Sequence, residues 1–388
     1  MAEQQYISNK PLRVLVVACN YPPFYDGISV FTQNLVEQLT NIGHTVELLN
    51  FGDREYSFAN LQLRDFWYTK ATAHPYYSLP SILNPLNLTD CNRGLRNFVF
   101  TNLVSRITNQ KIVEFKPDVM HLTYTRLFSA LTESTIPSVI TLHSEEVVDQ
   151  YPVHHALEQA SHVHSVSRYT AELAHTIRSI SKEKSAVINN SISVTNYRQH
   201  TSRKKQIVSI GRLSREKNFD TAIRAFHQLP EKIRSEYRYV IIGNGNERGP
   251  LQELINQLGL NDRVVLTGGI REEEKQQYLA ESELFLLCPR IKKGEQEGFG
   301  IVYLEAQASG LPIVASNIGG ITEAVEDAGI YIDNPEDPEA IAQGITRVLS
   351  DTNLYHQLQN SGKLRVHAFD HSKWVHKIEN LYQLVIQQ

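Results

Sequence analysis

Cysteine is scarce in this sequence. The 388 residues include three cysteines, Cys19, Cys91 and Cys288, which are far apart and form no CxxC pair. This spacing argues against a disulfide framework and against a structural zinc site. Cys19 and Cys288 each end an apolar run, where cysteine is expected to be a small buried hydrophobic residue. The sequence therefore fits a reducing compartment.

Long apolar runs and an excess of basic charge are also missing. No stretch approaches the roughly 18–20 apolar residues of a membrane-spanning helix. The N-terminus has an early acidic residue, and the apolar run that follows is too short for a signal peptide. The formal net charge of −4 gives no overall field that would attract nucleic acid. We expect a cytoplasmic protein with no nucleic-acid partner, whose contact with a membrane is at most peripheral.

Short apolar runs alternate with longer amphipathic segments along most of the chain. Leu12–Cys19 has the composition of a buried parallel strand, Ile28–Thr40 carries apolar residues at helical spacing, and His44–Asn50 resumes a strand. The polar stretch Ser191–Lys205 interrupts this alternation and is interpreted as a linker. The pattern predicts an α/β protein of two Rossmann-like, doubly wound domains, residues 1–195 and 196–372.

The other predicted elements follow the same rule. Further strands are expected at Asp118–Leu122, Ser138–Leu142, His162–Val166, Ser185–Ile188, Gln206–Ile210, Tyr239–Ile242, Val264–Leu266, Leu284–Leu287, Pro312–Ala315 and Ile330–Ile332. Helices are expected at Asn92–Phe115, from Arg168 to about Ser179, and at Arg271–Ser282 and Pro338–Ser350. Phe66–Cys91, which is rich in aromatic residues, Pro and Asn, is expected to form loops and short helices. Ligands of such folds bind at the carboxyl ends of the strands, so both domains should direct loops into a shared central cleft.

The segment EGFGIVYLEAQASG, Glu297–Gly310, follows a predicted strand and opens a predicted helix. Its first two glycines would let the backbone approach a ligand closely. The N–H groups of Phe299 to Val302 would be unpaired donors at the positive end of the helix dipole, which suits a diphosphate. Glu297 could accept hydrogen bonds from sugar hydroxyls, and Glu305, about two turns into the helix, could reach a ribose. The alternative is a helix whose early glutamate only offsets the dipole.

A second loop, GRLSREKN, lies between another predicted strand and helix and starts at Gly211. Arg212 and Lys217 are five residues apart and could both face one cleft. A bidentate guanidinium with a compact ammonium suits a diphosphate and would stabilise charge on a departing nucleotide. The alternative is solvated surface charge.

Three further features carry weaker signals. Gly27, between the first strand and its helix, would let a phosphate or sugar lie against the backbone. His143 ends a predicted strand and could bond a sugar hydroxyl, although a histidine there, like His121, is more often a structural residue. The segment GNGNERG, Gly243–Gly249, resembles a dinucleotide fingerprint, but its third glycine is one residue late. We interpret it as a strand–helix turn that lines the cleft.

Together these motifs resemble retaining glycosyltransferases of glycosyltransferase family 4, which have the two-domain GT-B fold. The resemblance covers nearly the whole chain: the PP…DGI turn, NIGHTV, GRLSREKN, IIGNGNE, VVLTGGI, EGFGIVYLEA and GLPIVASNIGG. EGFGIVYLEAQASG is most similar to the branch that includes the phosphatidylinositol mannosyltransferases. The chain departs from the family pattern at Asp26, in place of the first glycine of a pair, and at Ser191, in place of a glycine.

The resemblance implies a role for each matching residue. Arg212 and Lys217 would bind the donor diphosphate, Glu297 would hold sugar hydroxyls and Glu305 the ribose. Backbone N–H groups of Phe299, Gly300, Ile301 and Val302 would contact sugar and phosphate, and Ile270 the base. Gly27 and Gly211 would line the donor site, His143 would contact the sugar near the reacting carbon, and residues 373–388 would cross back onto the first domain.

The implied function is transfer of a hexose from a GDP- or UDP-linked donor to a hydroxyl of a glycan or lipid-linked acceptor, in cell-envelope polysaccharide or glycolipid synthesis. The resemblance implies retention of configuration and favours front-face attack, and no carboxylate nucleophile is evident at the sugar. Arg212 and Lys217 can supply positive charge and no DxD triplet is present, so we expect no cofactor and no obligatory metal. The alternatives are another GT-B enzyme, such as a nucleotide-sugar epimerase or a phosphorylase, and a non-catalytic sugar-binding protein. Aromatic and basic residues in Asp65–Arg126 could contact an anionic membrane; the alternative is a solvated helix face with core aromatics.

Overall fold

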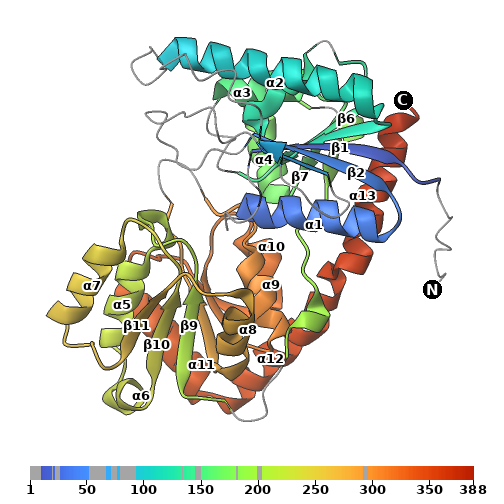
Figure 1. Cartoon of the computed structure of the whole chain (residues 1–388). Coiled ribbons are helices and arrows are strands. Elements are labelled where there is room, and N and C mark those ends of the chain that lie inside the picture. Colours follow the sequence, from blue (N-terminus) through green and yellow to red (C-terminus); the bar gives the residue numbers. More distant parts are fainter. Residues whose placement is uncertain are drawn as a thin grey trace. The chain divides into compact units, whose positions relative to one another are not determined.

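The computed structural model describes residues 10–19, 21, 27–51, 67–70, 77–78, 93–132, 134–144, 150–180, 182–198, 203–291 and 296–388. The chain divides into two compact units. The first combines Met1–Ser165 with Ala174–Ala186 and Val375–Gln388, and the second combines Val166–Leu173 with Val187–Trp374. Each unit is a sheet covered by helices (Figure 1).

The sheet of the first unit has the strand order β4-β3-β2-β1-β5-β6-β7-β8. Its strands are β1 (Arg13–Ala18), β2 (Thr45–Asn50), β3 (Trp67–Lys70), β4 (Tyr77–Ser78), β5 (Val119–Leu122), β6 (Ser138–Leu142), β7 (His162–Ser165) and β8 (Ser185–Val187). Pairing is parallel from β2 through β1, β5 and β6 to β7. The central strands are buried on both faces, which explains their continuous apolar runs.

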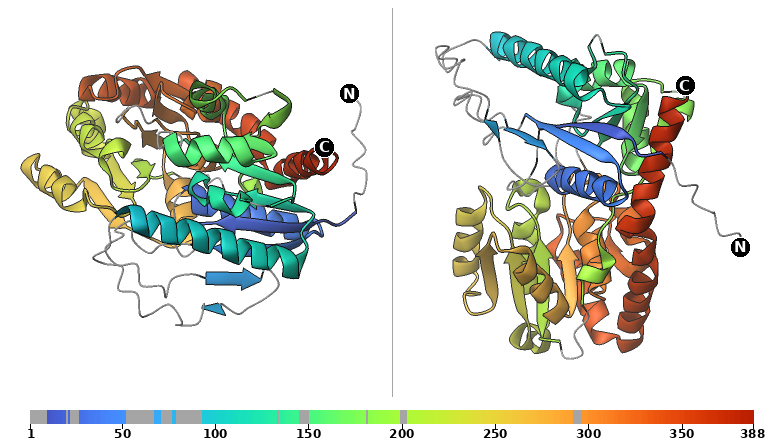
Figure 2. Two further views of the ribbon diagram at one scale, coloured as in Figure 1. Left: turned by 90° about the horizontal axis from the view of Figure 1, so that it is seen from above. Right: turned by 45° about the vertical axis from the view of Figure 1, so that its right-hand side comes forward.

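Helices of the first unit are α1 (Gly27–Asn41), α2 (Arg93–Phe115), α3 (Gln150–Gln159), α4 (Arg168–Ile177, shared with the second unit) and the C-terminal α13 (His371–Ile386). The apolar stripe of α1, which includes Phe31, Leu35 and Leu39, is buried as its spacing predicts. From Val375 onward, α13 belongs to the first unit and lies beside its sheet (Figure 2). The Tyr382 hydroxyl of α13 forms a 2.6 Å hydrogen bond with the ring of His121, which is in β5.

One prediction for the first unit is wrong. Strands β3 and β4 lie within Phe66–Cys91, which we expected to contain loops and short helices. Strand β3 pairs antiparallel with β2, and β4 pairs antiparallel with β3. The sequence of β3, WYTK, is aromatic and β-branched, so strand propensity at this sheet edge outweighs the surrounding Pro and Asn residues. Other residues of that segment lie outside the described ranges.

The sheet of the second unit has the order β11-β10-β9-β12-β13-β14, parallel throughout. Its strands are β9 (Gln206–Ile210), β10 (Arg238–Ile242), β11 (Val264–Gly268), β12 (Leu284–Leu287), β13 (Ile313–Ser316) and β14 (Gly329–Ile332). All six match predicted strands to within two residues. The order reverses between β9 and β12, which is the point where a doubly wound sheet binds ligands.

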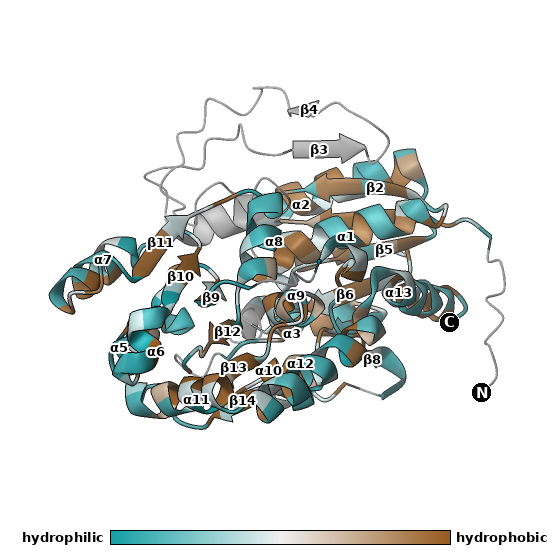
Figure 3. Ribbon diagram, turned by 90° about the horizontal axis from the view of Figure 1, so that it is seen from below, coloured by the Kyte–Doolittle hydropathy of each residue, from teal (hydrophilic) through white to brown (hydrophobic). Residues whose placement is uncertain are grey.

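Helices cover both faces of this sheet. They are α5 (Phe219–His227), α6 (Glu231–Glu236), α7 (Arg248–Gln257), α8 (Glu272–Glu281), α9 (Ile301–Ala308), α10 (Ile321–Val325), α11 (Pro338–Ser350) and α12 (Thr352–Val366). Helix α5 packs with α7 and α11, whereas α9 packs with α10 and α12. Right-handed crossovers put these two groups on opposite faces, because the chain moves in opposite directions along the sheet from β9 and from β12. In Figure 3 the strands are mainly brown, and teal gathers on the helices around them.

Both units are therefore doubly wound α/β domains, and the predicted fold class is confirmed. The predicted linker is partly ordered, since Ile192 forms a parallel bridge with Asp370 and Val194–Asn196 is a 3₁₀ turn. The sequence prediction divides the chain at residue 195 and returns residues 373–388 to the first domain. The second unit begins its long segment at Val187, and Val375–Gln388 groups with the first unit.

Candidate functional site

Two loops at the carboxyl edge of the second sheet interlock through glycines. The N–H of Gly211 donates to the carbonyl of Ile242 at 3.0 Å, and the N–H of Leu213 donates to the carbonyl of Asn244 at 2.8 Å. A Cβ on Gly243, whose φ is 145°, would lie 1.9 Å from the Gly211 oxygen. This close approach explains the first glycine of GNGNERG without a dinucleotide, because the glycine is needed to support the GRLSREKN loop.

Asn218 and Arg290 fix the end of the GRLSREKN loop. Asn218 is buried in the left-handed conformation with φ 61°, which asparagine tolerates better than most residues. Its side-chain amide donates to the carbonyls of Cys288 and Pro335 at 2.9 and 2.6 Å, and its oxygen accepts from Arg290 Nε at 2.8 Å. The neighbouring Lys217 is thereby directed from a rigid turn.

Lys217 and Glu297 form an ion pair between the two predicted motifs. Their side chains are 21% and 20% exposed, so the pair is largely shielded but still reached from solvent. Arg212 is not part of this pair; it bonds Glu216 at 3.1 Å and its side chain is 54% exposed. The structure thus brings Lys217 and Glu297 together and leaves Arg212 on a more open part of the same loop.

The EGFG segment ends in a helix start, as predicted, but the helix begins later. Helix α9 starts at Ile301, and Gly300 is its left-handed N-cap with φ 84°. A Cβ on Gly300 would lie 2.6 Å from the Tyr303 ring. No described residue accepts a hydrogen bond from the backbone N–H of Phe299, Gly300, Ile301 or Val302. The first two donors belong to the turn before the helix, and the four together are unpaired N–H donors at a helix N-terminus.

The glycine pair Gly319–Gly320 supports this turn from the next loop. The N–H of Gly320 donates to the carbonyl of Glu297 at 2.9 Å. A Cβ on Gly320 would lie 1.9 Å from the oxygen of Gly298, so the two loops can be this close only with glycine there. Sequence reasoning assigned no role to these glycines, although they lie in the loop that follows β13, as Gly211 and Gly243 lie in the loops after β9 and β10.

Glu305 lies just over one turn into α9, nearer the helix start than predicted. It is buried, and its Oε1 pairs with Lys275 Nζ at 2.8 Å. Its Oε2 is also buried and accepts no hydrogen bond from a described residue. Burial lowers the pKa of Lys275, but the carboxylates of Glu305 and Glu272 outweigh that effect and raise this pKa above its usual value. Lys275 therefore stays charged beside an oxygen that can still accept a hydrogen bond.

Ile270 follows β11 on the same edge of the second sheet. The preceding Gly268 has φ 79°, and a Cβ on Gly269 would lie 3.1 Å from the side-chain amide nitrogen of Asn244. Ile270 itself is half-buried. The turn is therefore tight and packed against the GNGN loop, and it presents the backbone of Ile270 at the carboxyl end of β11.

The first unit contributes Gly27 and His143 to the predicted set. Gly27 is the first residue of α1, and a Cβ there would meet nothing within 4 Å, so its surroundings are open. His143 directly follows β6, and its ring lies edge-on to Phe31 with centroids 4.9 Å apart. Burial lowers the pKa of His143 to about 3, so the ring is neutral at physiological pH. Asp26 lies outside the described residues.

A buried hydrogen-bond chain runs below His143. The His121 ring bonds Tyr382 and Thr141, each at 2.6 Å, and Thr141 bonds the His164 ring at 2.9 Å. Burial holds the pKa of His121 well below its usual range. His121 therefore has the satisfied structural environment that was its default interpretation.

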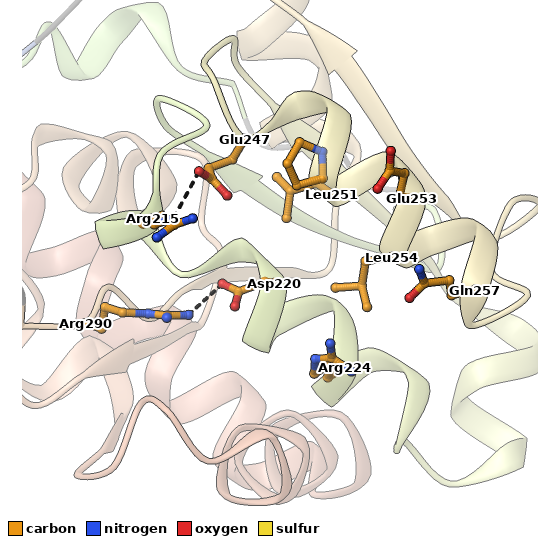
Figure 4. A pocket seen from close by; sticks show the side chains of 10 residues that line it. Arg215, Asp220, Arg224, Glu247, Leu251, Glu253, Leu254, Gln257 and Arg290 are labelled. Carbon is orange, nitrogen blue, oxygen red and sulfur yellow. Dashed lines mark hydrogen bonds and ion pairs between the residues drawn. The ribbon is translucent and has the colours of Figure 1, made fainter.

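A depression of about 400 Å³ lies between α5 and α7 and is lined by Arg215 of the GRLSREKN loop (Figure 4). Three arginines and three carboxylates line it together with apolar residues of α7. Arg215 pairs with Glu247 at 3.4 Å and Arg290 with Asp220 at 2.6 Å. The first pair connects the loop to the start of α7, and the second connects Arg290, which also bonds Asn218 of the loop, to α5. We therefore interpret this surface as a support for the loop.

We searched the described part of the chain for metal sites and for membrane-spanning helices. There, no cluster of three or more His, Cys, Asp and Glu side chains has the arrangement of a metal site. No helix in that part combines the length and the apolar character needed to cross a bilayer.

Two family models match consecutive parts of the chain and together span residues 25–365. The glycosyltransferase family 4 model matches residues 25–196, and the model of glycosyl transferases group 1 matches residues 195–365. The chain is thus a glycosyltransferase of the family 4 type with the GT-B fold.

Individual relatives agree with this class. An uncharacterised glycosyltransferase of Methanocaldococcus jannaschii is 24% identical over 97% of this chain and 99% of its own length. A GDP-mannose-dependent α-(1-6)-phosphatidylinositol monomannoside mannosyltransferase of Mycolicibacterium smegmatis is 33% identical, over 43% of this chain and 44% of its own.

Two solved structures have the same fold. Sucrose-phosphate synthase from Thermosynechococcus elongatus has a TM-score of 0.76 at 20% identity, covering 97% of this chain and 99% of its own. Anabaena HepE in complex with UDP-glucose has a TM-score of 0.70 at 17% identity, covering 96% and 99%.

Proposed function

We propose that this glycosyltransferase transfers a hexose, with retention of configuration, from a GDP- or UDP-linked donor to a hydroxyl of a glycan or lipid-linked acceptor. The observation that carries the proposal is the grouping in the second unit of the Lys217–Glu297 pair with the open N–H groups of the α9 start. A diphosphate needs cations and N–H donors, and a sugar needs a carboxylate acceptor. The site of the second unit offers all of these.

Each residue has a distinct role in the proposed reaction. Lys217 and Arg212 bind the diphosphate and stabilise the negative charge that grows on it as the bond to the sugar breaks. Glu297 is held by Lys217 and accepts from sugar hydroxyls, so it orients the ring. The backbone from Phe299 to Val302 binds sugar and phosphate oxygens.

The remaining donor contacts concern the nucleoside and the first domain. The free Oε2 of Glu305 accepts from the ribose, and the backbone of Ile270 contacts the base. Gly27 and Gly211 leave room for the phosphate and the sugar. His143, neutral at physiological pH, bonds a sugar hydroxyl near the reacting carbon.

The proposed mechanism is front-face attack. The acceptor oxygen forms its bond to the anomeric carbon on the side from which the diphosphate leaves, and a phosphate oxygen takes the acceptor proton. The protein supplies positioning and charge stabilisation. Arg212 and Lys217 provide that charge in a reaction that we propose requires no metal.

The proposed setting is the cytoplasm, where the enzyme serves the synthesis of a cell-envelope polysaccharide or glycolipid. The mannosyltransferase relative, which is named for a phosphatidylinositol monomannoside, supports a lipid-linked acceptor. For peripheral contact with an anionic membrane, the test is co-sedimentation with anionic and neutral liposomes. Equal or no binding to the two would contradict this contact.

The function is tested with a panel of GDP- and UDP-sugars, measured as release of free nucleotide with and without acceptor. We expect one donor to release nucleotide in an acceptor-dependent way, with the α-anomeric product that retention of an α-linked donor requires. Isomerised nucleotide sugar without release would indicate an epimerase, and sugar phosphate formation a phosphorylase. Binding without turnover across the acceptors would indicate a sugar-binding protein.

A further inference from the structure

Lys275 is a charged residue of the site that no sequence motif identifies. It lies in α8 directly after three glutamates, in the sequence EEEK, and such a charge run predicts a solvent-exposed helix surface. In the structure its side chain is only 17% exposed, and Nζ lies 2.8 Å from both Glu305 Oε1 and Glu272 Oε2. One ammonium thus bridges two carboxylates from different helices.

The consequence for Glu305 is a fixed orientation. Oε1 is occupied by Lys275, and Oε2 is buried and accepts no hydrogen bond from a described residue. A buried carboxylate oxygen without a donor is costly, so it marks a place where a ligand donor fits. Without Lys275, the negative charges of Glu272 and Glu305 would repel each other with no cation between them.

Tyr197 is a second polar neighbour of the carboxylates of Glu272 and Glu305. Its hydroxyl donates to Glu272 Oε1 at 3.5 Å. Burial, followed by the charges of Glu305 and Glu272, raises the pKa of Tyr197, so the phenol keeps its proton. Lys275 contacts both carboxylates, and Tyr197 interacts with both as well. The oxygen that accepts no hydrogen bond from a described residue within 3.5 Å is Oε2 of Glu305.

We propose that Lys275 is a positioning residue that makes the site select ribonucleotides: by holding Oε1 of Glu305, it leaves Oε2 to accept from a ribose hydroxyl. This proposal rests on the proposed function, because it requires a nucleoside diphosphate at this site. Removal of Lys275 removes the contact that fixes Oε1 of Glu305, so the carboxylate can rotate and the preference for ribose is lost.

The test is the ratio of affinities for a ribonucleoside diphosphate and its deoxyribose analogues. Calorimetry would use UDP and GDP with their 2′-deoxy and 3′-deoxy forms on the full chain. We expect the wild-type protein to prefer at least one ribonucleotide by about 10-fold or more, as a hydrogen bond to a charged group implies. In Lys275→Met this ratio should fall to about 1–2-fold, with deoxy affinity little changed.

Two further variants separate positioning from general damage. Lys275→Arg, which retains a cation able to hold both carboxylates, should restore most of the ratio. Lys204→Met removes the ion pair with Glu281 at the other end of α8 and should leave the ratio at its wild-type value. If Lys275→Met does not fold, Lys275→Gln replaces it, with thermal unfolding as the check.

The outcomes distinguish this proposal from the proposed function. If the wild-type protein binds neither nucleotide, both fail. If it binds a ribonucleotide but Lys275→Met and Lys275→Gln keep the wild-type ratio, the role of Lys275 is overturned and the donor site stands. Equal loss of affinity for ribose and deoxyribose forms would also overturn it, because that pattern indicates structural damage only.

Discussion

The ion pair of Lys217 with Glu297 joins two motifs that are eighty positions apart in sequence. Each partner has one obvious task, a cation for phosphate and a carboxylate for sugar hydroxyls. The pair also stabilises the enzyme without a ligand. Each side chain is largely shielded from water, and a shielded charge without a partner would be unfavourable. A ligand diphosphate can then share Lys217 without exposing an unpaired charge.

Replacing Lys217 with Ala should lower kcat by about 10²–10³-fold, the usual effect of losing one group that stabilises transition-state charge. Steady-state kinetics with the identified donor measures this. Arg215→Ala is the matched control, since Arg215 is in the same loop but pairs with Glu247. Its kcat should stay within about 2-fold of wild type. Unchanged transfer in Lys217→Ala, or in Arg212→Ala, would contradict the mechanism.

Buried neutral histidines predict how stability depends on pH. Burial lowers the pKa of His143 to about 3 and that of His371 to about 4. In the unfolded chain histidine takes up a proton near pH 6.5, so below that pH the unfolded state binds more protons and stability falls as pH falls. Each histidine contributes a slope of up to about 1.4 kcal/mol per pH unit between about pH 6.5 and its folded pKa.

Urea unfolding between pH 7 and 4.5 measures this slope. It should become shallower in His371→Gln, which removes one such proton. His356→Gln, at an exposed position on α12, should leave the slope unchanged. An equal slope in His371→Gln and the wild type would contradict the assignment.

At the scale of elements, glycines decide how closely the loops of the second sheet approach. Gly320→Ala places a Cβ 1.9 Å from the Gly298 oxygen. Backbone must then move, so we expect a loss of about 1–3 kcal/mol in the free energy of unfolding and weaker donor binding. Gly249→Ala, on α7 with nothing within 4 Å, should leave stability unchanged or raise it by about 0.5–1 kcal/mol. Denaturant midpoints of the two variants compare them directly, and equal effects would refute the packing argument.

The elements that sequence analysis predicted well are those with a strong hydrophobic period. Strands β9 and β12 and helix α11 have the predicted bounds, because buried parallel strands and amphipathic helices have distinct patterns. Strand β3 and helix α3 were not foreseen. The first is a short edge strand among loop-forming residues, and the second is a short helix that begins near Pro152.

The site divides in the same way. Lys217, Glu297 and the α9 start follow from strand–loop–helix position, because parallel strands bring their carboxyl ends to one edge. The roles of three other residues could not be predicted: Lys275, Asn218 and Arg290. Their partners are distant in sequence and are brought together only by tertiary packing. An EEEK run gives no sign of which charge is buried.

At the scale of the whole molecule, the chain leaves the first unit and returns to it. The returning segment is bound by specific contacts: Tyr382 bonds His121, and Glu379 lies 3.5 Å from His44. A protein that ends at Trp374 should keep the second unit folded and lose protection in the first. Hydrogen exchange at β5 and β13 would show this, with fast exchange at β5 only. Fast or slow exchange at both strands alike would contradict it.

A point variant of α13 tests the same contact. Tyr382→Ala removes a fully buried ring and its hydrogen bond, so it should cost about 3–5 kcal/mol. Leu384→Ala, at a position 48% exposed, should cost less than about 1 kcal/mol. Thermal unfolding of both variants measures the difference, and a similar cost for the two would mean that α13 is held by other contacts.

The return of α13 also bears on synthesis of the protein by the ribosome. Val375–Gln388, which completes the first unit, is translated after the second unit, so His121 and His44 lack their partners while the second unit is being made. The second unit contains its own complete sheet and can fold as it emerges. Folding during translation would then proceed from the second half of the chain to the first, the reverse of the usual N-to-C order of domain folding. In nascent chains stalled before Val375, we expect the first unit to be incompletely folded and to bind chaperones.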